Sequence, residues 1–111
     1  MSTFHLELVT PDGTQFESDA VSVVIPGVRG SWGVLARHAP MIGAVGDGVL
    51  KVETEGGTKY FVVTGGVAEI DPVRTVILAD GLMEAENPGD AEQKLQEWRA
   101  DRHRRTTAVA E

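Results

Sequence analysis

Short β-rich runs, separated by turns that contain glycine, dominate the first 85 residues. Twelve of the thirteen glycines precede residue 86, mostly in turn-like settings such as Pro11-Asp12-Gly13 and Gly46-Asp47-Gly48. The runs between them are rich in valine, with 15 valines against 7 leucines in the whole chain. This regular spacing, with no helical pattern between the runs, favours an antiparallel sandwich or barrel of eight to ten strands.

Two segments have the two-residue period of a half-buried strand. Phe4, Leu6 and Leu8 alternate with other side chains, and the same alternation appears in residues 50–54. The segment Glu55-Gly56-Gly57-Thr58 is predicted to close a hairpin.

A different pattern begins after residue 86. Asn87-Pro88-Gly89-Asp90 supplies an N-cap, a proline at the first helical position and an acid in the first turn. We expect a helix over residues 88–105, with residues 106–111 frayed. Its thin apolar stripe of Ala91, Leu95 and Trp98 predicts docking on another surface. The chain therefore divides into a β domain, residues 1–85, and a short helical segment, residues 86–111.

Charge and composition exclude several classes of function. The 111 residues carry a net charge of −7, and the first 85 hold 11 acidic and 5 basic side chains, which disfavours nucleic-acid binding. The arginine cluster near the C-terminus is interpreted as the cationic end of the helix rather than as an anion site (Arg99, Arg102, Arg104, Arg105). Without cysteine there is no disulfide or thiolate metal site. Because apolar runs are short and the first residues do not resemble a secretory signal, we expect a soluble cytosolic protein.

No catalytic constellation emerges from the motifs. His5, His38 and His103 lack the short spacings of a zinc site, so no metal is expected. The segment Gly30-Ser31-Trp32-Gly33 is not a nucleophile elbow, which leaves a Ser31/His38 hydrolase a remote alternative. Phosphate-binding and dinucleotide-binding glycine motifs are also absent, and no cofactor is expected.

The segment from Pro26 to Pro40 is unusual because apolar residues are interspersed with glycines. Such a loop suggests a contact surface, whereas Trp32 could instead close one end of the core. For His38 we expect a hydrogen bond within its own loop rather than a switch.

Seven segments, in order and spacing over about residues 4–84, resemble the epsilon subunit of bacterial F-type ATP synthase, the counterpart of the mitochondrial delta subunit. They are Phe4-His5-Leu6-Glu7-Leu8-Val9-Thr10-Pro11-Asp12-Gly13, Val23-Val24-Ile25-Pro26-Gly27, Gly30-Ser31-Trp32-Gly33-Val34-Leu35, His38-Ala39-Pro40, Gly48-Val49-Leu50, Gly65-Gly66-Val67-Ala68-Glu69 and Leu78-Ala79-Asp80. The resemblance implies a ten-stranded antiparallel β-sandwich in the central stalk, which performs no chemistry itself. It also implies a peripheral location on the cytoplasmic face of the inner (plasma) membrane, reached only through the complex.

The resemblance further implies partners and contact residues. The family's sandwich binds the gamma subunit and rests on the c-ring, so that ion-driven rotation reaches the α/β hexamer indirectly. Thr10 and Gly43 fall where the family meets gamma. The ring-facing positions are Val28, Arg29, Gly30, Ser31, Trp32, His38, Ala39, Pro40, Met41 and Ile42. The alternative is a free-standing acidic β-sandwich that binds a regulatory protein or a small ligand.

The C-terminal region departs from the family pattern. Members often carry two C-terminal helices, whereas we expect one here. Some members also bind ATP through a motif that ends in Asp-x-x-Arg-Ala. Here the stretch is Asp90-Ala91-Glu92-Gln93-Lys94, with Gln93 in place of the arginine and Lys94 in place of the alanine. We therefore expect no ATP binding, and a docked helix instead.

Overall fold

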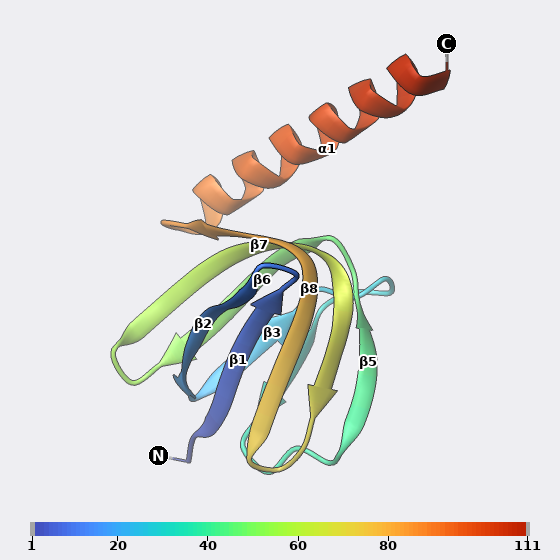
Figure 1. Cartoon of the computed structure of the whole chain (residues 1–111). Helices are drawn as coiled ribbons and strands as arrows, with labels where there is room; N and C mark the ends of the chain where they lie inside the picture. Colours follow the sequence, from blue (N-terminus) through green and yellow to red (C-terminus); the bar gives the residue numbers. More distant parts are fainter. Residues whose placement is uncertain (1, 111) are drawn as a thin grey trace.

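The computed structural model describes the backbone of residues 2–110 and the side chains of residues 2–102. These residues form eight strands followed by one helix (Figure 1). The strands are β1 (Phe4–Thr10), β2 (Gly13–Ala20), β3 (Ser22–Ile25), β4 (Trp32–Leu35), β5 (Met41–Val45), β6 (Gly48–Thr54), β7 (Gly57–Ile70) and β8 (Arg74–Ala85), and the helix is α1 (Pro88–Ala110). None of the described helical residues form a segment long and apolar enough to cross a membrane.

The sheet has the strand order β2-β1-β8-β7-β6-β3-β4, and β5 pairs with β7. The expectation of ten strands is wrong, since residues 2–110 contain eight. The reason is that β7 and β8 are 14 and 12 residues long, and each runs through both layers of the fold. The first half of β7 pairs with β6 and the second half pairs with β5. Each long strand thus takes the place of two shorter ones.

The expectation of a wholly antiparallel sheet is also wrong. Strand β1 pairs with β8 in parallel, from His5 opposite Arg74 to Val9 opposite Leu78. The other strand pairs among the described residues are antiparallel. Since parallel neighbours need a long connection, the β1–β8 pair closes one layer only after most of the chain has been placed.

The chain bends between layers at Gly65 and Gly66, in the middle of β7. Both glycines have positive φ, at 67° and 136°. A Cβ atom on Gly66 would lie 2.1 Å from the backbone oxygen of Leu78. Only glycine therefore lets β7 turn here while it stays paired with β8.

The core lies between the two layers and follows the alternation read from the sequence. Phe4, Leu6 and Leu8 are buried, which confirms the two-residue period of β1. Across the layers, the rings of Phe16 and Phe61 stack at a tilt, with centroids 5.2 Å apart. The other buried members of this core are Ala20, Val23, Ile25, Val34, Val45, Leu50, Val52, Val63, Ala68, Ile70, Ile77 and Ala79.

The predicted hairpin after β6 is confirmed, because Thr54 pairs with Gly57 across the turn. Helix α1 begins at the predicted Pro88 but continues to Ala110, so the expected end at residue 105 and the frayed segment after it are wrong. The residues near the predicted end carry no helix-stopping glycine or proline. The side chains of His103, Arg104 and Arg105, and residue 111, lie outside the described part.

Candidate functional site

A row of apolar side chains crosses the outer face of one layer. Val9, Leu78, Val67 and Ala44 are successive partners on β1, β8, β7 and β5. Each of the four has a chain neighbour that is buried in the core (Leu8, Ile77, Ala68 and Val45), so these four point outward. Leu78 is 43% exposed and Val67 is 39% exposed. An outward sheet face usually carries polar residues, so this apolar row marks a surface suited to a partner.

The predicted gamma-contact positions flank this apolar row. Thr10 follows Val9 at one end of the row, and Gly43 precedes Ala44 at the other. The Thr10 hydroxyl accepts a hydrogen bond from the backbone N–H of Asp12 (3.2 Å), which fixes the turn after β1. Sequence reasoning missed the row itself, because each of its members looks like an ordinary strand residue until the register is known.

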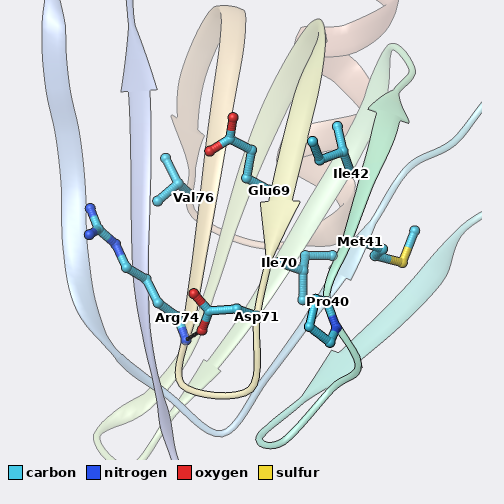
Figure 2. Close-up of a pocket in the computed structure, with 8 residues that line it drawn as sticks. All are labelled: Pro40, Met41, Ile42, Glu69, Ile70, Asp71, Arg74 and Val76. Atoms are coloured by element: carbon cyan, nitrogen blue, oxygen red, sulfur yellow. Dashed lines mark hydrogen bonds between the residues drawn. The ribbon is translucent and has the colours of Figure 1, made fainter.

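A hollow of about 660 Å³ lies beside the apolar row (Figure 2). Two of its charged side chains, Asp71 and Arg74, have structural partners. Asp71 Oδ1 accepts hydrogen bonds from the backbone N–H groups of Val73 and Arg74 (2.9 and 2.8 Å), and the Arg74 guanidinium contacts Glu7 at 2.9 Å. The lining residues are Pro40, Met41, Ile42, Glu69, Ile70, Asp71, Arg74 and Val76. Since Ile42 is 74% exposed, the hollow extends the apolar surface.

The indole of Trp32 is half-buried and packs against the core, as one of the two interpretations of its loop predicts. Its role in a contact surface stays a prediction. The indole lies over two glycines, since a Cβ atom on Gly43 or Gly27 would come within 3.1 Å of the ring. The other side of the ring borders a second hollow of about 390 Å³, lined by Trp32, Gly33, His38, Met41, Gly43 and Ala44.

The predicted ring-facing residues form two groups at opposite ends of β4 (Figure 1). Residues 28–31 form an exposed loop, whose base is closed by hydrogen bonds between the backbones of Gly27 and Gly30 (3.1 and 3.3 Å). Residues 38–40 lie at the other end, between β4 and β5, and Met41 and Ile42 begin β5. There Nδ1 of His38 lies 2.7 Å from the carbonyl oxygen of Ala39, as predicted for a loop-stabilising histidine. The second hollow brings Trp32, His38 and Met41 together, but not Val28, Arg29, Gly30 or Ser31.

Helix α1 docks on the opposite layer through a separate apolar cluster. Ala91 and Leu95 are buried against Val62 and Ala85. Trp98 is half-buried at the edge of this cluster, and the Arg102 guanidinium lies 5.3 Å from the centroid of its ring.

Asp47, in the turn between β5 and β6, holds the docked helix at a second point, nearer its C-terminal end than the apolar cluster. Its carboxylate lies 3.4 Å from Nη1 of Arg102, and its carbonyl oxygen lies 3.5 Å from Nη2 of Arg99. The sequence alone did not identify this contact, because the two partners are more than 50 residues apart.

Asp90, the residue that matches the family's ATP motif, caps the helix. Its Oδ2 accepts a hydrogen bond from the backbone N–H of Glu86 (2.9 Å) and pairs with Lys94 (3.0 Å). Its own N–H donates to Asn87 Oδ1 (2.8 Å), which completes a reciprocal cap. The hydrogen bond from Glu86, followed by that from Lys94, lowers the pKa of the Asp90 carboxyl.

We expect α1 to loosen in acid because of this cap. A carboxyl with a lowered folded pKa stabilises the fold fully above its unfolded pKa and loses that contribution as the pH falls through the folded value. The helical circular dichroism signal should therefore drop below about pH 4. In an Asp90→Asn variant this acid-induced loss of helical signal should be smaller. An equal loss in the variant would contradict the role of Asp90.

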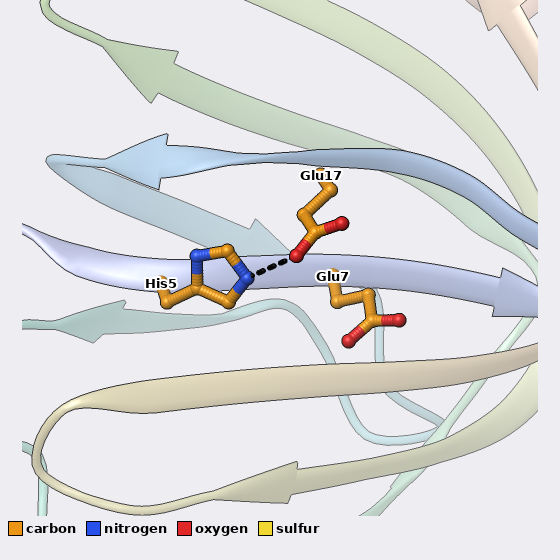
Figure 3. Close-up of side chains that lie close together, drawn as sticks. All are labelled: His5, Glu7 and Glu17. Carbon is orange, nitrogen blue, oxygen red and sulfur yellow. Dashed lines mark hydrogen bonds and ion pairs between the residues drawn. The ribbon is translucent and has the colours of Figure 1, made fainter.

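One polar cluster lies on the outer face that carries the apolar row, at the β1–β2 edge of that face. His5, Glu7 and Glu17 each offer a ligand atom, and these atoms lie within 4.8 Å of one another (Figure 3). Sequence spacing did not suggest a metal site, because Glu17 reaches His5 only through the β1–β2 hairpin. The turn at Pro11-Asp12-Gly13 was the available signal, since it sets the register that brings them together.

Comparisons with known proteins agree with this architecture. A family model described as ATP synthase, Delta/Epsilon chain, beta-sandwich domain matches residues 3–85. Among curated relatives, the ATP synthase epsilon chain 1 of Nitrobacter hamburgensis is 42% identical and an epsilon chain of Rhodopseudomonas palustris is 41% identical, each over 80 residues. Each alignment covers 72% of this chain and 59% of the relative, so the chain spans less than two thirds of their length.

Two solved assemblies contain similar chains. One is a Euglena gracilis mitochondrial ATP synthase, described as OSCP/F1/c-ring, with a TM-score of 0.70, 25% identity, and coverage of 90% of this chain and 66% of that chain. The other is the central stalk and c-ring of Tetrahymena thermophila mitochondrial ATP synthase, with a TM-score of 0.62, 16% identity, and coverage of 74% of this chain and 66% of that chain. The second likeness concerns the fold alone.

Proposed function

The chain belongs to the family of ATP synthase delta and epsilon chains, and we propose that it is a non-catalytic rotor subunit of F-type ATP synthase. In this role it binds the gamma subunit, rests on the c-ring, and passes ion-driven rotation toward the α/β hexamer. Its place is then peripheral, on the cytoplasmic face of the cell membrane. The apolar row is the observation that carries this proposal.

The gamma subunit is proposed to cover the apolar row. Thr10 and Gly43, the family's gamma positions, flank the row. Burial of exposed aliphatic side chains is the main favourable term in protein association. The sheet beneath is held by hydrogen bonds on both sides of β7 and β8, which gives a stiff surface for transmitting torque.

The c-ring is proposed to meet the two segments that flank β4. Val28 is 86% exposed in a loop of the Pro26–Pro40 segment, and Ile42 offers a second exposed apolar side chain. Trp32 lies between these segments with one side of its indole on the core. A contact made by Trp32 would therefore be supported directly by the packed interior.

The proposal is tested by mixing the full chain with an α/β/gamma core from the same organism. Size-exclusion chromatography should yield a complex with one copy of the chain per core, and the peak is then assayed for ATP hydrolysis. Failure to co-elute with a competent core would refute the rotor role. A free-standing β-sandwich that binds a regulatory protein or a small ligand would then be the better interpretation.

A Leu78→Asp substitution should weaken this association by at least about 10-fold, because it places a charge in the middle of a desolvated apolar contact. Isothermal titration calorimetry against the core measures the change. Val73→Asp is the matched control, since Val73 is also exposed but lies outside the apolar row, in the turn between β7 and β8. Equal affinities for the two variants would argue against the apolar row as the gamma contact.

A further inference from the structure

The polar cluster at the β1–β2 edge is built by strand register. His5 lies opposite Asp19, and Glu7 lies opposite Glu17, in the antiparallel β1–β2 pair. Residues two apart on a strand share a face, so all four side chains project from the same outer surface. Nε2 of His5 lies 2.6 Å from Oε2 of Glu17 (Figure 3). An imidazole and two carboxylates therefore converge from two rigid, neighbouring strands.

Glu7 is held in place from two sides. The Thr14 hydroxyl donates a hydrogen bond to its Oε2 (2.8 Å), and the Arg74 guanidinium donates one to its Oε1 (2.9 Å). The Thr14 hydrogen bond, followed by that from Arg74, lowers the pKa of the Glu7 carboxyl. Each carboxylate oxygen retains a second lone pair, so these bonds leave room for a further ligand.

His5 has an outer partner as well. Its Nδ1 faces the Asp19 carboxylate at 3.7 Å, while its Nε2 faces Glu17. At 3.7 Å, Asp19 lies beyond hydrogen-bond distance and adds a negative charge beside the imidazole. Thr14 and Arg74 orient Glu7, and Asp19 lies beside His5.

The cluster also carries unbalanced charge. Glu7, Glu17 and Asp19 contribute three negative charges, and Arg74 is the cation that pairs with Glu7. Like charges directly opposite each other destabilise a strand pair, as Glu7 and Glu17 do here. A bound cation would relieve this repulsion.

We propose that His5, Glu7 and Glu17 form an open binding site for a borderline divalent cation such as Zn²⁺. The ion replaces the direct His5–Glu17 hydrogen bond, and water completes its tetrahedral shell. One imidazole with two carboxylates suits zinc better than Mg²⁺, which prefers all-oxygen octahedral sites. The site lies at the β1–β2 edge and is independent of the proposed rotor role.

The test is calorimetric titration of the full chain with zinc chloride, with magnesium chloride in a parallel run. We expect one zinc ion to bind per chain, and binding to weaken at least about 10-fold in His5→Gln and in Glu17→Gln. Magnesium should bind at least about 10-fold more weakly than zinc. Zinc should also shift the NMR resonances of the His5 ring, which a purely structural role of His5 would not produce.

His38→Gln is the control, because His38 lies in the loop between β4 and β5 and is not one of the three candidate ligands. Thermal unfolding of each variant checks that the sandwich is intact. Unchanged zinc affinity in Glu17→Gln, loss of zinc binding in His38→Gln, or no zinc binding by the parent chain would each overturn the proposal.

Discussion

Replacing Gly66 with alanine is expected to destabilise the sandwich by at least about 3 kcal/mol. The new methyl group would lie 2.1 Å from the backbone oxygen of Leu78, and a φ of 136° is strained for any residue with a side chain. Relief requires β7 to separate from β8 at the point where the sheet folds from one layer to the other. Urea unfolding followed by tryptophan fluorescence measures the loss of stability.

Gly56→Ala is the matched control for this substitution. Gly56 lies in the turn between β6 and β7, and a Cβ atom there would approach nothing closer than the Thr54 hydroxyl at 3.8 Å. Its φ is not positive, so alanine should change the stability by less than about 1 kcal/mol. If Gly66→Ala lowered the stability no more than Gly56→Ala, β7 would not approach the backbone of Leu78 as closely as the structure shows.

A Leu95→Asp substitution is expected to release α1 from the sheet. Leu95 is 4% exposed among Val62, Ala85 and Ala91, an apolar cluster in which a carboxylate would lose its hydration. Most of the stability of a helix in a protein comes from packing of its apolar face rather than from intrinsic propensity. The helical part of the far-UV circular dichroism should therefore fall by more than about half.

The sandwich should stay folded when α1 is released from the sheet. The cluster beneath α1 is separate from the core between the two layers, so the urea midpoint followed by Trp32 fluorescence should move little. Trp98 also fluoresces, and a Trp98→Phe background removes its signal. Gln96→Asp, one position along on the exposed side of α1, is the control for adding charge to the helix. Equal loss of helical signal in both variants would show that helix propensity, and not docking, is responsible.

Local patterns predicted local structure well. The alternation of Phe4, Leu6 and Leu8, the hairpin that ends at Gly57, and the helix start at Pro88 follow from neighbouring residues, and all three are confirmed. The turn pattern predicted eight to ten strands, a range that includes the observed eight, whereas the ten strands implied by the resemblance are wrong because two long strands continue through glycines. Gly65-Gly66 bends β7 and Gly81 lies within β8, yet both strands continue. The parallel β1–β8 pair is invisible to such patterns, since its partners are about 70 residues apart.

The candidate site was less accessible to sequence reasoning for a similar reason. In the sequence, Val67 and Leu78 look like ordinary strand residues, and only the register shows that they point outward in one row. His5 and Glu17 become neighbours only across a hairpin. By contrast, Asp90 was recognisable as a helix-capping residue from the four residues around it, because a cap is a local interaction.

The pairing of the first strand with the last determines the order in which the sandwich can fold during synthesis. When β1 leaves the ribosome, β2 is its only early partner, and the strand that completes its layer begins at Arg74. At about 5 to 20 residues per second, that wait lasts seconds. Until then the apolar side of the β1–β2 ribbon faces water. The nascent chain therefore passes through a period in which chaperones can engage it, and the sandwich closes in a late step that joins its two ends.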